Sequence, residues 1–199
     1  MEAVHESELI ARLKAGEGDA FEQLVRTHGG RLLAVARRFV RNESDAQDIV
    51  QAVYLCAFRS INQFEGGCQI GTWLHRIVVN QALMRLRTRR RKPEESIEAL
   101  LPAFQDDGHH VEQFSDWSVG ADVLLERQQT RATVRACIDQ LPANYREVLI
   151  LRDIEELPTQ DVAQLLNLTP TAVKVRLHRA RQALSTLLRD EYASARVTV

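Results

Sequence analysis

The chain has 199 residues, of which 45% are hydrophobic and 27% are charged, and its net charge is −1. This composition is typical of a globular protein with one or two domains, and the apolar runs are far shorter than the roughly 20 residues needed to cross a bilayer. The N-terminus lacks the segments of a secretory signal, and the three cysteines form no CxxC pair. We therefore expect a cytoplasmic protein with free thiols and no membrane insertion.

The charges are segregated along the chain. Seven basic residues and no acid lie within 76–92, and five basic residues and no acid lie within 170–189. Between them, residues 94–126 contain nine acids and no Lys or Arg. Two basic segments separated by an acidic one indicate two contacts with a polyanion.

Apolar residues at spacings of three and four predict helices over the N-terminal part of the chain. The first helical stretch covers residues 7–40, with interruptions expected at the glycine-containing segments 16–19 and 29–30. A further helix is expected to begin with Ser44 as its N-cap and to end near Arg59. The N-terminal part of the chain is therefore expected to form an all-α domain.

Residues 63–71 contain three glycines and predict a loop short and flexible enough to hold an unstacked base. A long helix is expected to follow, from Thr72 to just before Pro93. One face of this helix is predicted to carry Arg76, Asn80, Leu83, Arg87 and Arg90. Because the other positions are mostly apolar, we expect a largely buried helix that exposes a stripe suited to nucleic acid.

Residues 94–126 lack sustained periodicity and predict an acidic linker. Beyond it, helices are expected up to Pro142, over 143–153, over 159–166 and over 171–189. The fold class is therefore all-α, with two small helical domains joined by the linker. The predicted parts are a domain at 1–93, the linker at 94–126, a domain at 127–190 and a tail at 191–199.

The segment 159–189 predicts a helix-turn-helix in which residues 167–169 form the turn. Thr159 and Thr169 are suited to cap its two helices, and Pro170 suits the first helical position. One arc of the second helix carries Val173, Leu177, Ala180, Leu184 and Leu187. The opposite face and its flanks carry Thr171, Lys174, Val175, Arg176, His178, Arg179, Arg181 and Gln182.

This outward face suits the major groove of DNA, which displays donors, acceptors and thymine methyl groups. Lys174 and Arg179 are suited to bind phosphate or guanine, and Val175 is suited to contact a thymine methyl group. His178 and Gln182 can form hydrogen bonds with base edges. The two flanking arginines are expected to hold backbone phosphate, which sets position rather than sequence.

Several motifs resemble the σ70 family of bacterial RNA polymerase sigma factors. Residues 45–51, 64–66 and 72–80 resemble its region 2, and residues 141–152 and 172–181 resemble its region 4. With only these two regions and a short linker, the chain is similar to the extracytoplasmic function (ECF) group. The likeness covers most of the chain, and the order and spacing of its motifs make it specific.

The resemblance implies binding to core RNA polymerase at the β′ clamp helices through Asp45, Asp48, Ile49, Gln51, Ala52 and Leu55. It implies recognition of the −10 element, with a flipped base in single-stranded DNA, through Phe64, Gln69, Trp73, Arg76, Asn80 and Arg87. It implies reading of the −35 duplex through Thr171, Lys174, Val175, Arg176, His178, Arg179 and Gln182. It also implies a contact with the β flap, an anti-sigma factor as inhibitor, and a linker that lies in a positively charged polymerase channel.

No nucleophile–base motif, paired catalytic carboxylates or phosphate-cradling glycine loop is present in the sequence, so we expect no enzyme, no catalytic residue and no cofactor. His109 and His110 lack a third ligand at suitable spacing, so we expect no metal site. A stand-alone helix-turn-helix regulator is the alternative, and it leaves the stripe around Arg76 and Asn80 unexplained. A module that binds only other proteins is a third reading.

Overall fold

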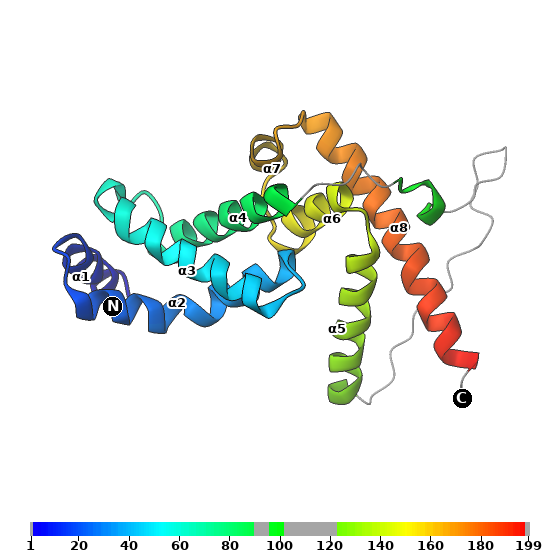
Figure 1. Cartoon of the computed structure of the whole chain (residues 1–199), viewed down its shortest axis with the longest axis horizontal. Helices are drawn as coiled ribbons and strands as arrows, with labels where there is room; N and C mark the ends of the chain where they lie inside the picture. The colour runs from blue at the N-terminus through cyan, green and yellow to red at the C-terminus, as the bar shows by residue number, and fades with distance from the viewer. Residues whose placement is uncertain (1, 90–95, 102–122, 198–199) are drawn as a thin grey trace. The chain divides into compact units, whose positions relative to one another are not determined.

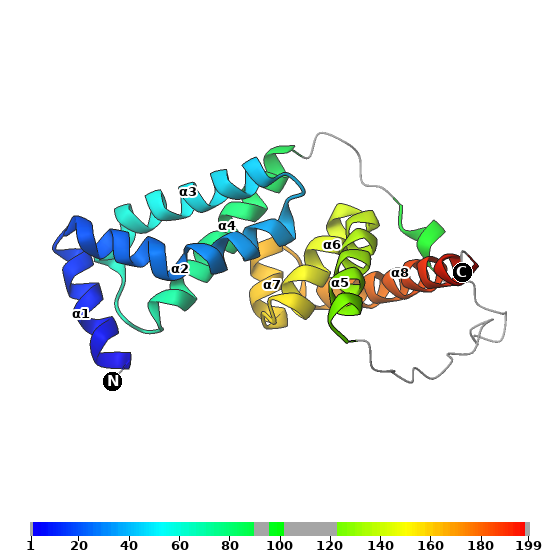
Figure 2. The same cartoon turned by 90° about the horizontal axis from the view of Figure 1, so that it is seen from below.

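The computed structural model describes residues 2–89, 96–101 and 123–197, and the chain divides into two compact units, 1–92 and 93–199 (Figures 1 and 2). All regular structure in the described residues is helical, which confirms the predicted all-α fold class. Within these residues, no helix combines the length and the apolarity that a membrane-spanning segment needs.

The first unit contains α1 (Glu2–Lys14), α2 (Gly18–Phe39), α3 (Glu43–Ser60), the 3₁₀ turn η1 (Ile61–Gln63) and α4 (Ile70–Arg89). Helices α2, α3 and α4 all pack against one another, and α1 packs against α2 and η1 (Figure 1). The largest fully buried side chains of this unit are Leu13, Leu24, Phe39, Val53, Leu74, Val78 and Val79. The core therefore draws on all four helices.

The glycine pair at 29–30 does not interrupt α2, so that part of the prediction is wrong. Gly29 lies where a Cβ atom would be 3.5 Å from the Tyr54 hydroxyl oxygen of α3, and this hydroxyl donates a hydrogen bond to the Val25 carbonyl. The helix therefore tolerates the cost of each glycine, which is about 1 kcal/mol relative to alanine in a helix interior. The predicted break at 16–19 is present, and Gly16 there adopts a φ of +79°.

Two predicted helix starts differ from the structure. Asn42, rather than Ser44, caps α3, because its side-chain oxygen accepts a hydrogen bond from the Ser44 backbone N–H at 3.0 Å. The next long helix, α4, begins at Ile70 rather than at Thr72. Both starts depend on which backbone N–H groups find an acceptor, which periodicity alone does not show.

The second unit contains η2 (Glu98–Leu100), α5 (Val123–Gln140), α6 (Ala143–Leu149), the π-helical turn η3 (Ile150–Ile154), α7 (Thr159–Leu166) and α8 (Pro170–Val197). Helix α8 packs against α5, α6, α7 and η2. It continues to Val197, beyond the predicted end near Arg189. Side chains that are hardly exposed in this unit include Ile97, Val148, Ile150, Leu151, Val162, Val173 and Ala180.

Residues 96–101, predicted to belong to the linker, are part of the second unit. Ile97 is only 1% exposed, and the adjoining turn η2 packs against α8. Burying an isoleucine side chain contributes roughly 1.5–3 kcal/mol, which favours docking of this segment on the second unit. Residues 102–122 of the predicted linker lie outside the described residues.

The packing of α4 predicts a contrast between two of its side chains. Leu74→Ala should lower the free energy of unfolding of the first unit by about 2–5 kcal/mol, because Leu74 is fully buried and its loss leaves a cavity. Met84→Ala, at a position 57% exposed on the same helix, should change it by less than about 0.5 kcal/mol. Urea denaturation followed by circular dichroism measures both, and equal losses would contradict this packing.

Candidate nucleic-acid interfaces

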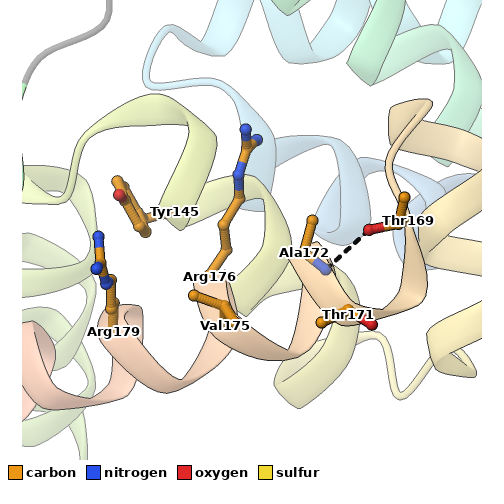
Figure 3. A pocket seen from close by; sticks show the side chains of 7 residues that line it. All are labelled: Tyr145, Thr169, Thr171, Ala172, Val175, Arg176 and Arg179. Atoms are coloured by element: carbon orange, nitrogen blue, oxygen red, sulfur yellow. Dashed lines mark hydrogen bonds between the residues drawn. The ribbon is translucent and has the colours of Figure 1, made fainter.

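The turn between α7 and α8 sets the direction in which α8 leaves. Asn167 adopts a left-handed conformation with φ +55°, and the Leu168 N–H donates to the Ala163 carbonyl at 2.8 Å, which closes α7. The Thr169 hydroxyl oxygen accepts a hydrogen bond from the Ala172 N–H at 3.1 Å (Figure 3), and Pro170 is the first residue of α8. The predicted turn and second cap are confirmed. Thr159, by contrast, is the first residue of α7 and not its cap.

The two faces of α8 separate as predicted. Val173, Leu177 and Ala180 are buried, whereas Leu184 and Leu187 farther along the helix are half-buried. On the other side, the exposed residues are Thr171, Lys174, Val175, His178 and Arg179, and Arg176 and Gln182 are half-buried. The start of α8 therefore exposes a basic and polar face, and its opposite, apolar face is buried in the second unit.

An open groove of about 400 Å³ lies on this exposed surface (Figure 3). It is lined by Tyr145, Thr169, Thr171, Ala172, Val175, Arg176 and Arg179. Tyr145 comes from α6, and the side chains of Arg176 and Arg179 extend from α8 toward the side where Tyr145 lies (Figure 3). The groove thus combines two cations, hydroxyl groups and the apolar side chain of Val175, which is 49% exposed.

Tyr145 was not among the predicted site residues. The available signal was an aromatic side chain with a hydroxyl group in the first turn of a helix, between Asn144 and Arg146. Only the packing of α6 against α8 shows that this side chain borders the groove on the exposed side of α8.

Arg181, expected to hold DNA phosphate, is engaged within the second unit. Its guanidinium group donates two hydrogen bonds to the Asp153 carboxylate of η3, at 2.7 and 2.8 Å. These hydrogen bonds raise the pKa of Arg181, an effect that desolvation partly opposes. A bidentate pair of this kind links α8 to η3, and the expectation that Arg181 also holds phosphate stays a prediction.

The predicted stripe on α4 needs one correction. Arg76, Asn80 and Arg87 are exposed, but Leu83 is only 3% exposed, and Met84 takes its place on the outer face. At about 100° per residue, position 84 lies about 40° from position 80, whereas position 83 lies about 60° away in the other direction. Arg90 lies outside the described residues.

The loop at residues 64–69 joins η1 to α4. Phe64 is 5% exposed, and its ring centroid lies 5.1 Å from that of Trp73, which is half-buried. Gly66 adopts a φ of +79°, a conformation that favours glycine, and Gln69 is exposed. Of the predicted loop residues, Gln69 is therefore accessible, whereas Phe64 is buried and packs against Trp73.

The predicted polymerase-binding residues of α3 divide between two faces. Asp45 and Ile49 are each 3% exposed, whereas Asp48, Gln51 and Leu55 are exposed and Ala52 is half-buried. The exposed residues are three, four and seven positions apart, so they share one outward face. The buried pair lies on the inner side of the helix and is not accessible to a partner.

Arg85 of α4 connects the two helices electrostatically. Its guanidinium group donates hydrogen bonds to Asp45 at 2.7 Å and to Asp48 at 3.1 Å. The hydrogen bond to Asp45 is the main reason that the pKa of Arg85 is raised above its ordinary value, and desolvation opposes it. The polar face of α4 and the outward face of α3 are thereby tied together.

Among the described residues, no group of three or more His, Cys, Asp or Glu side chains is arranged to hold a metal ion. His109 and His110 lie outside the described residues, so the expectation about them stays a prediction.

The comparisons with known proteins cover both units. Models of Sigma-70 region 2 and of Sigma-70 region 4 match residues 24–92 and 131–184. The RNA polymerase sigma-H factor of Pseudomonas aeruginosa is 32% identical over 183 residues, which cover 92% of this chain and 93% of that protein. The chain belongs to the ECF group of the sigma-70 family. It is an RNA polymerase sigma factor that directs transcription initiation, and it is not an enzyme.

Two further relatives support this assignment. The ECF sigma factor SigW of Bacillus subtilis is 29% identical over 181 residues, covering 91% of this sigma factor and 95% of SigW. The solved structure of CnrH in complex with the cytosolic domain of CnrY has a TM-score of 0.54 and 27% identity, covering 93% of this sigma factor and 97% of CnrH.

The ion pairs of Arg85 predict unequal roles for its two acids. Asp45→Ala should lower the urea midpoint of the first unit clearly, because it leaves a partly buried guanidinium group without its closest acceptor. Asp48→Ala should change the midpoint little, since Asp48 is 55% exposed in its side chain. A larger loss for Asp48→Ala than for Asp45→Ala would contradict this arrangement.

Proposed function

We propose that this sigma factor recognises its promoter at two places, with α8 on the −35 duplex and with α4 and the loop at residues 64–69 on the −10 element. The observation that carries the proposal is that both helices expose polar or basic residues directly opposite a buried apolar face. Such a helix presents its side chains to DNA in a fixed geometry. Membership of the sigma-70 family removes the stand-alone regulator as the leading alternative.

In the −35 duplex, the start of α8 enters the major groove. Lys174 and Arg179 bind phosphate or guanine, and Val175 contacts a thymine methyl group. Arg176 and the Tyr145 hydroxyl, at the edge of the groove in Figure 3, hold the DNA backbone. Thr171, His178 and Gln182 supply further polar contacts along the same side of α8.

At the −10 element, the exposed residues of α4 bind the opened strand. Arg76 and Arg87 neutralise phosphates, and Asn80 forms hydrogen bonds with a base edge. A flipped base is held at the loop between Gln69 and the half-buried ring of Trp73, whose position depends on Phe64 beneath it. Phe64 acts through Trp73 and does not contact DNA.

The outward face of α3 is proposed to bind core polymerase at its β′ clamp helices. Asp48, Gln51 and Leu55 combine a charge, an amide and an exposed apolar side chain, the last 53% exposed. Ala52, half-buried, leaves room for a helix to approach. Asp45 and Ile49 fix α3 from within, by the ion pair with Arg85 and by packing. A contact of the second unit with the β flap completes the assembly.

We further propose that this sigma factor acts in the cytoplasm and is inhibited by an anti-sigma factor that covers its basic faces. The complex of CnrH with the cytosolic domain of CnrY supports the idea that a second protein can hold such a chain. The domain at 1–93, the linker at 94–126 and the domain at 127–190 remain our proposed functional division, with residues 96–101 docked on the second unit.

The −10 assignment predicts a specific defect. Arg76→Ala and Asn80→Ala should each reduce open-complex formation by roughly tenfold, since one contact to a phosphate or base is worth about 1–3 kcal/mol. Fluorescence of 2-aminopurine placed in the −10 element measures strand opening, and pull-down with core polymerase measures assembly. Arg26→Ala, an exposed arginine of α2, is the control and should have no effect. Equal losses of assembly and opening would argue against the assignment.

The −35 assignment predicts altered salt dependence. Lys174→Ala and Arg179→Ala should weaken holoenzyme binding to a promoter with its −35 element, and each should reduce the slope of log affinity against log salt by about 1 if a phosphate contact is lost. Lys14→Ala removes the same charge from an exposed position in α1 and should leave the slope unchanged. Binding that is indifferent to both α8 substitutions would show that the reading face is misplaced.

A further inference from the structure

Helix α1 touches both ends of the loop at residues 64–69. It packs against η1, which ends at Gln63 immediately before the loop. At the other end of the loop, the Glu6 carboxylate of α1 accepts a hydrogen bond from the Ile70 backbone N–H at 2.5 Å. Leu9 and Leu13, 8% and 1% exposed, anchor α1 to the rest of the unit. Two contacts from one anchored helix therefore bracket the loop.

The Glu6 contact lies at the point where α4 begins. The Gln69 carbonyl accepts hydrogen bonds from the N–H groups of Thr72 and Trp73 at 3.0 and 3.1 Å, whereas the Ile70 N–H precedes the helical ladder and needs an acceptor from elsewhere. Glu6 supplies it from 64 positions away in the sequence. A carboxylate at this end also complements the positive pole of the helix dipole.

Close packing at Gly71 also restricts the start of α4. A Cβ atom at Gly71 would lie 3.3 Å from the imidazole of His28 in α2, so α2 and α4 approach closely there. Burial is the main cause that lowers the pKa of His28, and the nearby Glu6 carboxylate opposes this shift. The start of α4 is thus held by Glu6 and by close packing.

We propose that Glu6 is a positioning residue for −10 recognition, which fixes the exit of the loop so that Gln69 and Trp73 face the flipped base. This inference rests on the proposed function of the loop. Glu6 does not contact DNA, and it acts through the backbone of Ile70.

The test uses the full chain with purified core polymerase and a promoter duplex carrying 2-aminopurine in the −10 element. Glu6→Ala should slow strand opening by roughly fivefold, the effect expected from losing one helix cap. It should also reduce the ratio between the opening rates of a promoter with the native flipped base and one with a substituted base. The affinity for core polymerase should stay unchanged. Glu6→Gln keeps an acceptor oxygen and should restore most of the rate. Glu8→Ala, at an exposed position on the same helix, should behave as wild type.

Gln69→Ala distinguishes a failure of the proposed role of Glu6 from a failure of the proposed role of the loop. If Gln69→Ala slows opening and Glu6→Ala does not, Glu6 has no positioning role and the loop assignment stands. If neither substitution slows opening, the loop assignment fails and this inference fails with it. If Glu6→Ala reduces core binding and opening in proportion, or if Glu6→Gln is as defective as Glu6→Ala, the positioning role is overturned.

Discussion

The apolar faces of α4 and α8 determine what their opposite faces can do. Leu74 and Val78 bury one side of α4 in a core shared with α2 and α3, and Val173 and Ala180 do the same for α8 against α6 and α7. Because a helix is rigid over this length, burying one side fixes the direction of the other. The energy that folds each unit therefore also orders the side chains proposed to meet DNA.

The first unit carries both a proposed DNA-binding surface on α4 and a proposed polymerase-binding surface on α3. Arg85 bridges Asp45 and Asp48, so the proposed DNA-binding helix α4 and the proposed polymerase-binding helix α3 share one ion-pair network. A partner that binds Asp48 changes the electrostatic surroundings of Arg85 on α4.

Local patterns in the sequence predicted much of this structure, and long-range packing accounts for the rest. The turn at 167–169 and the Thr169 cap depend on neighbouring residues, and both were predictable. Helix α2 continues through Gly29, which lies beside Tyr54 of another helix. The burial of Asp45 depends on Arg85, 40 positions away, and that of Ile97 accompanies the packing of η2 on α8. For the same reason, the sequence could not show that three of its candidate site residues, Asp45, Ile49 and Phe64, face inward.

The central claim is that one chain reads two promoter elements through two separate surfaces. The most direct measurement is run-off transcription by core polymerase, with and without this sigma factor, on a library of duplexes in which both the −35 and −10 elements are varied. The claim predicts initiation that requires the added chain, and active templates enriched in two distinct sequence elements. Initiation that depends on only one element, or no initiation although the chain alone binds the duplexes, would contradict it.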